Sequence, residues 1–134
     1  MNPHTVLWAD DDPDDLFIYN EAVSEIDNKV VVTPVHNGRE LIDYLNEVKP
    51  HDGLPAMIVM DMNMPLVNGR EALALIKKDE SLSRIPLVVF TTSNSSVDAM
   101  FCLQHEVMMV TKPCLMRQIK EVIREILQLR WRGY

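Results

Sequence analysis

The sequence predicts an α/β fold, in which a doubly wound, five-stranded parallel sheet has the strand order 2-1-3-4-5. Five short apolar runs, rich in Val, Ile, Leu and Met, alternate with five amphipathic stretches. Runs this short are typical of parallel strands covered on both faces, and the alternation favours right-handed crossovers and this strand order. The runs are Thr5 to Ala9, Val30 to Val35, Ala56 to Met60, Leu87 to Phe90 and Val107 to Val110.

The stretch after the first run carries the signals of a helix start. Asp12 can cap the helix, and Pro13 fits its first position. The acids Asp14 and Asp15 suit the first turn, where they face the positive end of the helix dipole. We therefore expect these acids to serve the helix rather than to bind a ligand. The expected apolar face comprises Leu16, Phe17, Tyr19, Ala22, Val23 and Ile26.

The remaining four stretches are also predicted to be helices. Asn37-Gly38 and Asn68-Gly69 open the second and third helices, and Ser95-Ser96 opens a short fourth one. The last helix is expected from Leu115 to Trp131. The stripes that should face inward are Leu41, Ile42 and Leu45, then Ala72, Leu73 and Ile76, and in the last helix Ile119, Val122, Ile123 and Ile126.

Length and composition indicate one domain over residues 1–134, with its core at about residues 5–129. Of the 134 residues, 47% are hydrophobic and 25% charged, so the chain can bury a core without a disulfide or a structural metal. The formal net charge of -7 gives no general attraction for nucleic acid or an anionic membrane. No signal peptide and no apolar run of ~20 residues is visible, so we expect a cytoplasmic protein.

Polar side chains follow four of the five apolar runs. Asp10 and Asp11 follow the first run, and Asp61 follows the third. Thr91 follows the fourth run, and Lys112 lies shortly after the fifth. Ligands of doubly wound sheets bind beyond the carboxyl ends of the strands, so these five side chains are expected to meet in one crevice.

Three carboxylates in one crevice indicate a divalent cation, because they repel each other unless a cation neutralises them. Mg²⁺ fits best, since it takes oxygen ligands, binds through one or two carboxylates and leaves room for phosphate oxygens. A carboxylate beside Mg²⁺ and a lysine can attack phosphorus and form an acyl phosphate. Asp61, at the end of the central strand, is the best nucleophile candidate.

Four segments resemble the motifs of response-regulator receiver domains. They are Val6 to Asp12, Asp61 to Gly69, Phe90 to Ser93 and Thr111 to Pro113, and the resemblance covers the chain from Thr5 to about Leu129. It implies the flavodoxin-like (βα)5 fold of a stand-alone receiver, similar to chemotaxis regulators. It also implies a phosphorylation-dependent switch of a two-component system, without an output domain.

The resemblance implies a role for each matching acid. Asp61 would accept a phosphoryl group from a sensor histidine kinase or a histidine phosphotransfer protein. Asp11 and Asp61 would bind Mg²⁺ directly, together with the backbone carbonyl of Asn63, and Asp10 would act largely through water. Such a protein is not an enzyme in the usual sense, because it catalyses only its own phosphotransfer and dephosphorylation.

The resemblance also assigns the signalling parts. Lys112 would pair with the phosphoryl group, and Thr91 would move toward it and signal its presence. A downstream protein would bind the face formed by the fourth helix, fifth strand and fifth helix. The formation of a homodimer is also possible. Receivers often carry Tyr or Phe three residues before the lysine, where this chain has Met109, so the usual aromatic switch cannot operate here.

Two apolar segments leave their role open. The stretch from Val97 to Leu103 is apolar over more than one helix face. One face must pack on the sheet, and the remainder is either buried as well or exposed as a partner surface. Trp131 and Tyr134 would either pack back on the domain or contact another protomer. Four methionines are expected in the core rather than at a copper site, namely Met57, Met60, Met62 and Met64.

Other functions fit the sequence less well. A Mg²⁺-dependent phosphatase of the haloacid-dehalogenase type would need an aspartate where this chain has Asn63. A flavin or nucleotide site would need a loop rich in Gly, Ser and Thr, whereas the first run is followed by acids. A receiver-like scaffold that binds proteins without phosphorylation remains the alternative, although the acids, threonine and lysine argue against it.

Overall fold

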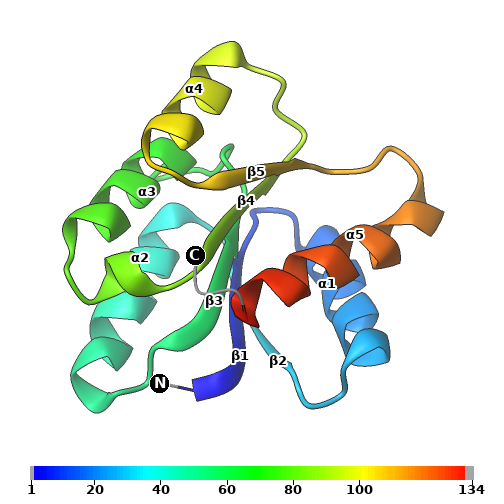
Figure 1. Ribbon diagram of the computed structural model, residues 1–134, viewed down its shortest axis with the longest axis horizontal. Coiled ribbons are helices and arrows are strands. Elements are labelled where there is room, and N and C mark those ends of the chain that lie inside the picture. Colours follow the sequence, from blue (N-terminus) through cyan, green and yellow to red (C-terminus); the bar gives the residue numbers. More distant parts are fainter. Residues whose placement is uncertain (1, 132–134) are drawn as a thin grey trace.

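The computed structural model describes the backbone of residues 2–131, in which the strands form one parallel sheet of order β2-β1-β3-β4-β5 (Figure 1). The predicted fold class and strand order are therefore confirmed. The strands are β1 (Asn2–Ala9), β2 (Val31–Val35), β3 (Pro55–Met60), β4 (Leu87–Thr91) and β5 (Met108–Thr111). β1 begins three residues before the predicted start, and the other bounds differ from prediction by one residue at most.

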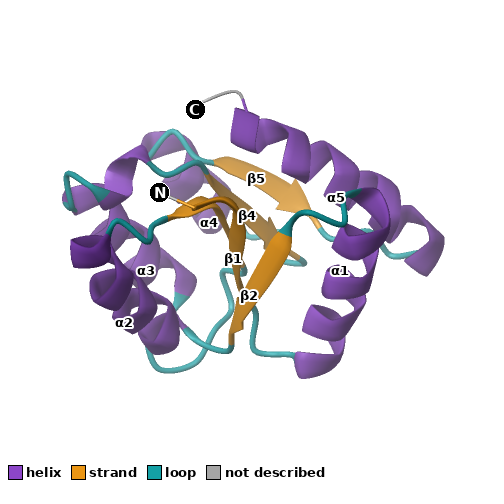
Figure 2. Ribbon diagram, turned by 90° about the horizontal axis from the view of Figure 1, so that it is seen from below, coloured by secondary structure: helices purple, strands orange, loops and turns teal. Residues whose placement is uncertain are grey.

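The main helices are α1 (Pro13–Ile26), α2 (Gly38–Val48), α3 (Gly69–Lys78), α4 (Ser96–Gln104) and α5 (Ile119–Gln128). α1 and α5 cover one face of the sheet, and α2, α3 and α4 lie on the other (Figure 2). α1 to α4 begin as predicted, each after a side chain that accepts a backbone hydrogen bond: Asp12, Asn37, Asn68 and Ser95. None of the described helices has the length and apolar character that a bilayer span requires.

Alternate residues of the central strands supply a core on each face of the sheet. Val6 and Trp8 of β1 pack with α1 and α5, whereas Leu7 and Ala9 pack with α2 and α3. The ring of Trp8 stacks on that of Tyr19, with 5.1 Å between centroids. The four methionines around β3 lie in the core as predicted: Met57, Met60, Met62 and Met64.

The prediction for the apolar face of α1 was wrong for one residue. Leu16, Tyr19, Ala22 and Val23 are buried, but Phe17 is 65% exposed. Neighbouring residues of a helix point about 100° apart, so a face that buries Leu16 turns Phe17 away from the sheet. Phe17 instead lines a shallow groove between α1 and β2.

The last helix is shorter than predicted at both ends. Leu115 and Met116 are exposed and precede α5, which follows a 3₁₀ turn, Met116–Gln118. Gln118 makes no side-chain cap, so the tighter turn leads into the helix instead. A second 3₁₀ turn, Leu129–Trp131, follows α5. The side chains of Trp131 and Tyr134 lie outside the described residues.

A glycine lets the start of α3 approach the loop after β3. A Cβ at Gly69 would lie 2.5 Å from the Cα of Met62. The backbone N of Gly69 donates to the carbonyl of Met62 at 3.0 Å. The loop that begins at Asp61 is therefore held against α3, which fixes the position of Asp61 at the end of β3.

Candidate functional site

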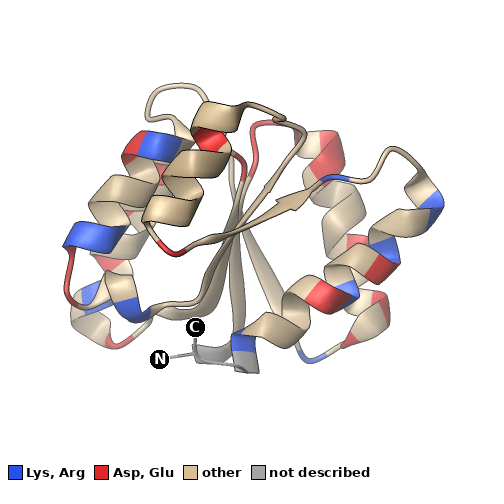
Figure 3. Ribbon diagram, turned by 45° about the horizontal axis from the view of Figure 1, so that its top comes forward, with Lys and Arg blue, Asp and Glu red and all other residues tan. Residues whose placement is uncertain are grey.

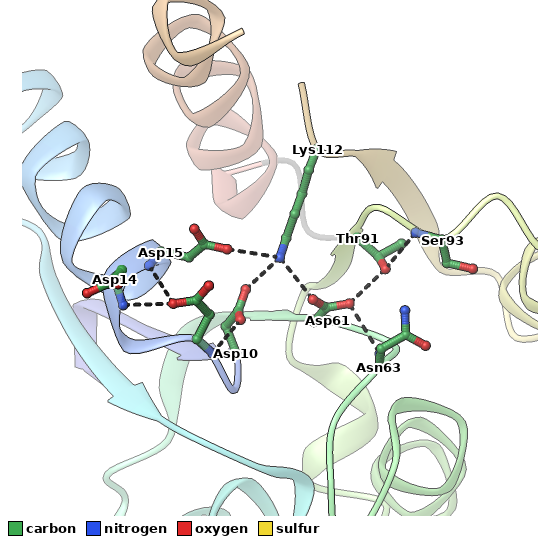
Figure 4. A network of polar contacts seen from close by, with 9 residues as sticks. Asp10, Asp14, Asp15, Asp61, Asn63, Thr91, Ser93 and Lys112 are labelled. Carbon is green, nitrogen blue, oxygen red and sulfur yellow. Dashed lines mark hydrogen bonds and ion pairs between the residues drawn. The ribbon is translucent and has the colours of Figure 1, made fainter. Parts of the chain in front are cut away.

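Strand pairing brings the predicted side chains to one end of the sheet, where acidic residues occupy the loop after β1 and the start of α1 (Figure 3). The backbone N of Asp61 donates to the carbonyl of Ala9 at 3.0 Å, which places Asp61 beside Asp10. On the other side of β3, the backbone N of Lys112 donates to the carbonyl of Thr91 at 2.9 Å. Side chains from four strand ends thus enter one crevice (Figure 4).

Asp61 lies at the centre of the crevice and is 6% exposed. Its Oδ2 accepts a hydrogen bond from Lys112 Nζ at 2.9 Å. Its Oδ1 accepts from Thr91 Oγ1 at 2.7 Å and from the backbone N of Asn63 at 3.2 Å. Both carboxylate oxygens are therefore oriented by donors from β4, β5 and the loop after β3.

Lys112 is one ammonium among three carboxylates. Its Nζ donates to Asp10 Oδ2 at 2.7 Å and to Asp61 Oδ2 at 2.9 Å, and Asp15 Oδ2 lies 3.7 Å away (Figure 4). The ring centroid of Tyr19 lies 5.9 Å from the same nitrogen. The group as a whole is negatively charged, which suits an additional cation.

Burial and pairing act against each other in this group. Burial lowers the pKa of Lys112, but its hydrogen bonds to Asp10 and Asp61 outweigh burial and raise the pKa above its usual value. Burial raises the pKa of Asp10 more than the hydrogen bonds from Lys112 and the Asp12 backbone lower it. The lysine is therefore firmly charged, whereas the charge on Asp10 is costly until a cation compensates it.

The carboxylates of Asp10, Asp11 and Asp61 can offer one oxygen each, with these atoms within 4.8 Å of one another. Asp10 and Asp61 are buried, and Asp11 is exposed at the rim. A hard cation such as Mg²⁺ prefers oxygen donors, so the acidic cluster is compatible with it. A cavity of about 410 Å³ opens beside the cluster, and its lining includes Asp11 and Asn63.

The acids that begin α1 divide into two kinds. Asp12 caps the helix as predicted, because its Oδ1 accepts from the backbone N of Asp14 and Asp15 at 2.9 and 3.4 Å. Asp15 also belongs to the first turn, yet it reaches Lys112, which the sequence interpretation missed. The available signal was that α1 begins at the same strand end as the crevice, so its first turn borders the site.

Sequence reasoning also missed a polar contact on the β4 side. Ser93 Oγ donates to Asp98 Oδ2 at 2.8 Å, and the backbone N of Ser93 donates to Thr91 Oγ1 at 3.1 Å. Asp98 is in the first turn of α4. The crevice is thus connected to α4 through Ser93, the last residue of one motif, and Asp98, which lies outside all four motifs.

Comparison with known sequences points to one family. Residues 6–124 match the family model of the response regulator receiver domain. Response regulator Rcp1 of Synechocystis sp. is 32% identical over 100 residues, covering 72% of this chain and 67% of that protein. The probable methanogenesis regulatory protein FilR2 of Methanothrix harundinacea is 29% identical over 138 residues, covering 99% and 86%.

Solved structures agree with this. The phosphorylated cyanobacterial phytochrome response regulator RcpA superposes with a TM-score of 0.88 and 28% identity, covering 97% of this chain and 95% of that chain. The Mn²⁺-bound form of response regulator Rcp1 superposes with a TM-score of 0.83 and 26% identity, covering 92% and 91%. RcpA was thus solved in its phosphorylated form, and Rcp1 was solved with a bound divalent cation.

Proposed function

The chain belongs to the response regulator receiver domain family, and on that basis we propose that it is a phosphorylation-dependent switch whose acceptor is Asp61. The observation that supports this most is the environment of Asp61. A half-buried lysine donates to one of its carboxylate oxygens, a threonine hydroxyl donates to the other, and two further carboxylates lie close by. The whole chain is proposed to act as one receiver domain.

The proposed reaction transfers a phosphoryl group from a donor histidine to Asp61. A carboxylate oxygen of Asp61 attacks phosphorus, an O–P bond forms, and the P–N bond of the phosphohistidine breaks. The imidazole nitrogen leaves with the electron pair. Lys112 then pairs with the phosphoryl oxygens, and the Thr91 hydroxyl donates to one of them instead of to the carboxylate.

Asp10, Asp11 and Asp61 are proposed to hold Mg²⁺, with the backbone carbonyl of Asn63 as a further ligand. When bound, Mg²⁺ would neutralise charge on the transferred group. The cluster of carboxylate oxygens supports this, and so does the excess of acids over lysine in the crevice. We propose that the chain catalyses only its own phosphotransfer and dephosphorylation.

The proposed partners are proteins of a cytoplasmic two-component pathway. A sensor histidine kinase or a histidine phosphotransfer protein would supply the phosphoryl group. A downstream protein, or a second copy of the chain, would read the state on the face of α4, β5 and α5. Large apolar side chains exposed on that face support this, namely Val97, Met100 and Leu103 of α4 and Met108 of β5.

The acceptor is tested by incubating the protein with acetyl phosphate and Mg²⁺ and measuring intact mass. We expect one added phosphoryl group, and none when EDTA replaces Mg²⁺. Asp61→Asn should abolish the addition because an amide oxygen is a poor nucleophile. Asp14→Asn is the matched control, since Asp14 is exposed in the first turn of α1. If a folded Asp61→Asn protein were labelled as well as the wild type, Asp61 would be excluded as the acceptor. If neither the wild-type protein nor the variants were labelled, a scaffold that works without phosphorylation would be favoured.

A further inference from the structure

We propose that Ser93 and Asp98 form the link through which phosphorylation of Asp61 changes the start of α4. The inference rests on the proposed function, because it concerns how an occupied acceptor is sensed. Ser93 and Asp98 act as positioning residues, since they contact Thr91 and α4 rather than the reacting atoms.

A continuous series of hydrogen bonds leads from the acceptor to α4. Thr91 Oγ1 donates to Asp61 Oδ1 at 2.7 Å and accepts from the backbone N of Ser93 at 3.1 Å (Figure 4). Ser93 Oγ in turn donates to Asp98 Oδ2 at 2.8 Å. Because Asp98 lies in the first turn of α4, the series ends on that helix.

Asp98 is held from several sides, and its side chain is only 13% exposed. Its Oδ1 lies 3.6 Å from Arg70 Nε of α3, and its backbone N donates to the cap Ser95 Oγ at 3.3 Å. The backbone N of Ser95 donates back to Ser93 Oγ at 3.2 Å. A shift of Ser93 therefore disturbs the cap, the first turn of α4 and its ion pair with α3 together.

Phosphorylation disturbs this series at Thr91. The new group adds roughly -1.5 to -2 charge and places strong acceptor oxygens beyond the carboxylate. A hydroxyl has one proton to donate, so Thr91 must leave its present geometry to bond the phosphoryl group. The amide of Ser93 then follows Thr91 or loses its acceptor. Either change weakens the contact between Ser93 and Asp98 and loosens the start of α4.

Met109 of β5 cannot take over this role. It is half-buried and packs against the core cluster under α3 and α4. A thioether is a weak acceptor and carries no donor, so it cannot follow the hydroxyl of Thr91 through a donated hydrogen bond. A loosened first turn would move the exposed apolar side chains of α4, namely Val97, Met100 and Leu103. Phosphorylation of Asp61 would therefore change the surface that a partner protein contacts.

The link is tested by hydrogen–deuterium exchange of the α4 amides, residues 96–104, in the full chain. Beryllofluoride with Mg²⁺ serves as the phosphoryl mimic, and fluorine NMR measures its occupancy. In the wild-type protein we expect loading to speed exchange in α4 about fivefold or more, the lower end of typical coupling between sites.

Three serine variants separate coupling from simple loosening. Ser93→Ala should show fast exchange in both states, so that loading changes it little, whereas Ser93→Thr keeps the hydroxyl and should retain the wild-type response. Ser95→Ala removes the cap of α4 and should speed exchange in both states by a similar factor, which preserves the response. Asp98→Ala provides a second break in the link and should behave like Ser93→Ala.

A wild-type response in fully loaded Ser93→Ala and Asp98→Ala would overturn the inference. A fully loaded wild-type protein without any change in α4 would also overturn it. In both cases the acceptor role of Asp61 would stand. Failure of the wild-type protein to load at all would refute the proposed function, and the inference would fall with it.

Discussion

Lys112 is surrounded by Asp10, Asp15 and Asp61, and two of these carboxylates are buried. One ammonium cannot neutralise three carboxylates, and burial raises the pKa of Asp10 because its charged form is poorly solvated. The arrangement that suits a divalent cation and a phosphoryl group is therefore unfavourable for the stability of the cation-free protein. Function and stability oppose each other at the same residues.

We predict that Asp10→Asn raises the free energy of unfolding in EDTA, because burial disfavours the charged form of Asp10. The expected gain is roughly 1 kcal/mol, the usual size of the effect of a single substitution. The amide keeps the size of the side chain and an acceptor for the backbone N of Asp12 but removes a buried charge. Mg²⁺ should stabilise the variant less than the wild-type protein, because a ligand is lost.

Urea unfolding with and without Mg²⁺ measures both effects. Asp12→Asn is the matched control, since asparagine also caps helices and Asp12 is exposed. A clear loss of stability for Asp10→Asn in EDTA would show that the pairing with Lys112 outweighs burial and repulsion, contrary to this prediction.

The residues of the crevice differ in how far the sequence could predict them. Asp61 directly follows β3 and Thr91 is the last residue of β4. The ends of parallel strands meet at one edge of a sheet, so the proximity of these residues follows from the fold class. Asp15 and Asp98 lie in first turns of helices, where an acid is expected in any case. Whether such an acid also reaches the site depends on the tilt of its helix, which the sequence pattern does not encode.

At the scale of elements, Asp79 connects α2 and α3 on the face opposite α1. Its Oδ2 accepts from Lys49 Nζ, just after α2, at 2.6 Å. Its Oδ1 accepts from the backbone N of Ser81 and Leu82 at 2.9 and 3.1 Å. The hydrogen bond from Lys49, followed by the one from Leu82, holds the pKa of Asp79 below its usual value.

We predict that thermal stability at neutral pH falls in the order wild type, Asp79→Asn, Asp79→Ala. Asparagine keeps the turn contacts to Ser81 and Leu82 but loses the charge that pairs with Lys49, and alanine loses both. The pKa of Asp79 is lower in the folded protein than its unfolded value of 3.8. The stability advantage of the wild-type protein over Asp79→Asn is therefore fully present above pH 3.8. It disappears as the pH falls through the pKa of Asp79 in the folded protein.

Melting temperatures over a series of pH values test this order. The gap between Asp79→Asn and Asp79→Ala should persist in acid, because it comes from neutral hydrogen bonds. A gap between wild type and Asp79→Asn that stays constant with pH would show that the ion pair with Lys49 contributes nothing.

Helix starts were more predictable than helix faces. Asp12, Asn37 and Ser95 are capping residues, and a cap acts through local backbone geometry that the sequence specifies. Phe17 could not be placed in the same way. Leu16 and Phe17 are both apolar and point about 100° apart, so the rotation of α1 against the sheet decides which of the two is buried. The start of α5 lacked a capping side chain, so local signals gave no sharp bound.

At the scale of the whole molecule, strand order could be predicted because right-handed crossovers leave few topologies for alternating strands and helices. The order places β1 and β3 side by side at the centre of the sheet, so the acids after both strands must meet. The communication from the crevice to α4 could not be predicted, because it depends on the side chains of Ser93 and Asp98 rather than on topology.

The most direct measurement of the central claim is chemical mapping of the phosphorylated residue. Borohydride reduces an aspartyl phosphate to homoserine, which peptide mass spectrometry locates in the sequence. After incubation with acetyl phosphate and Mg²⁺, we predict homoserine at position 61, and none there when Mg²⁺ is withheld. Homoserine at position 10 or 11, or none anywhere in a protein that has gained a phosphoryl group, would contradict the account.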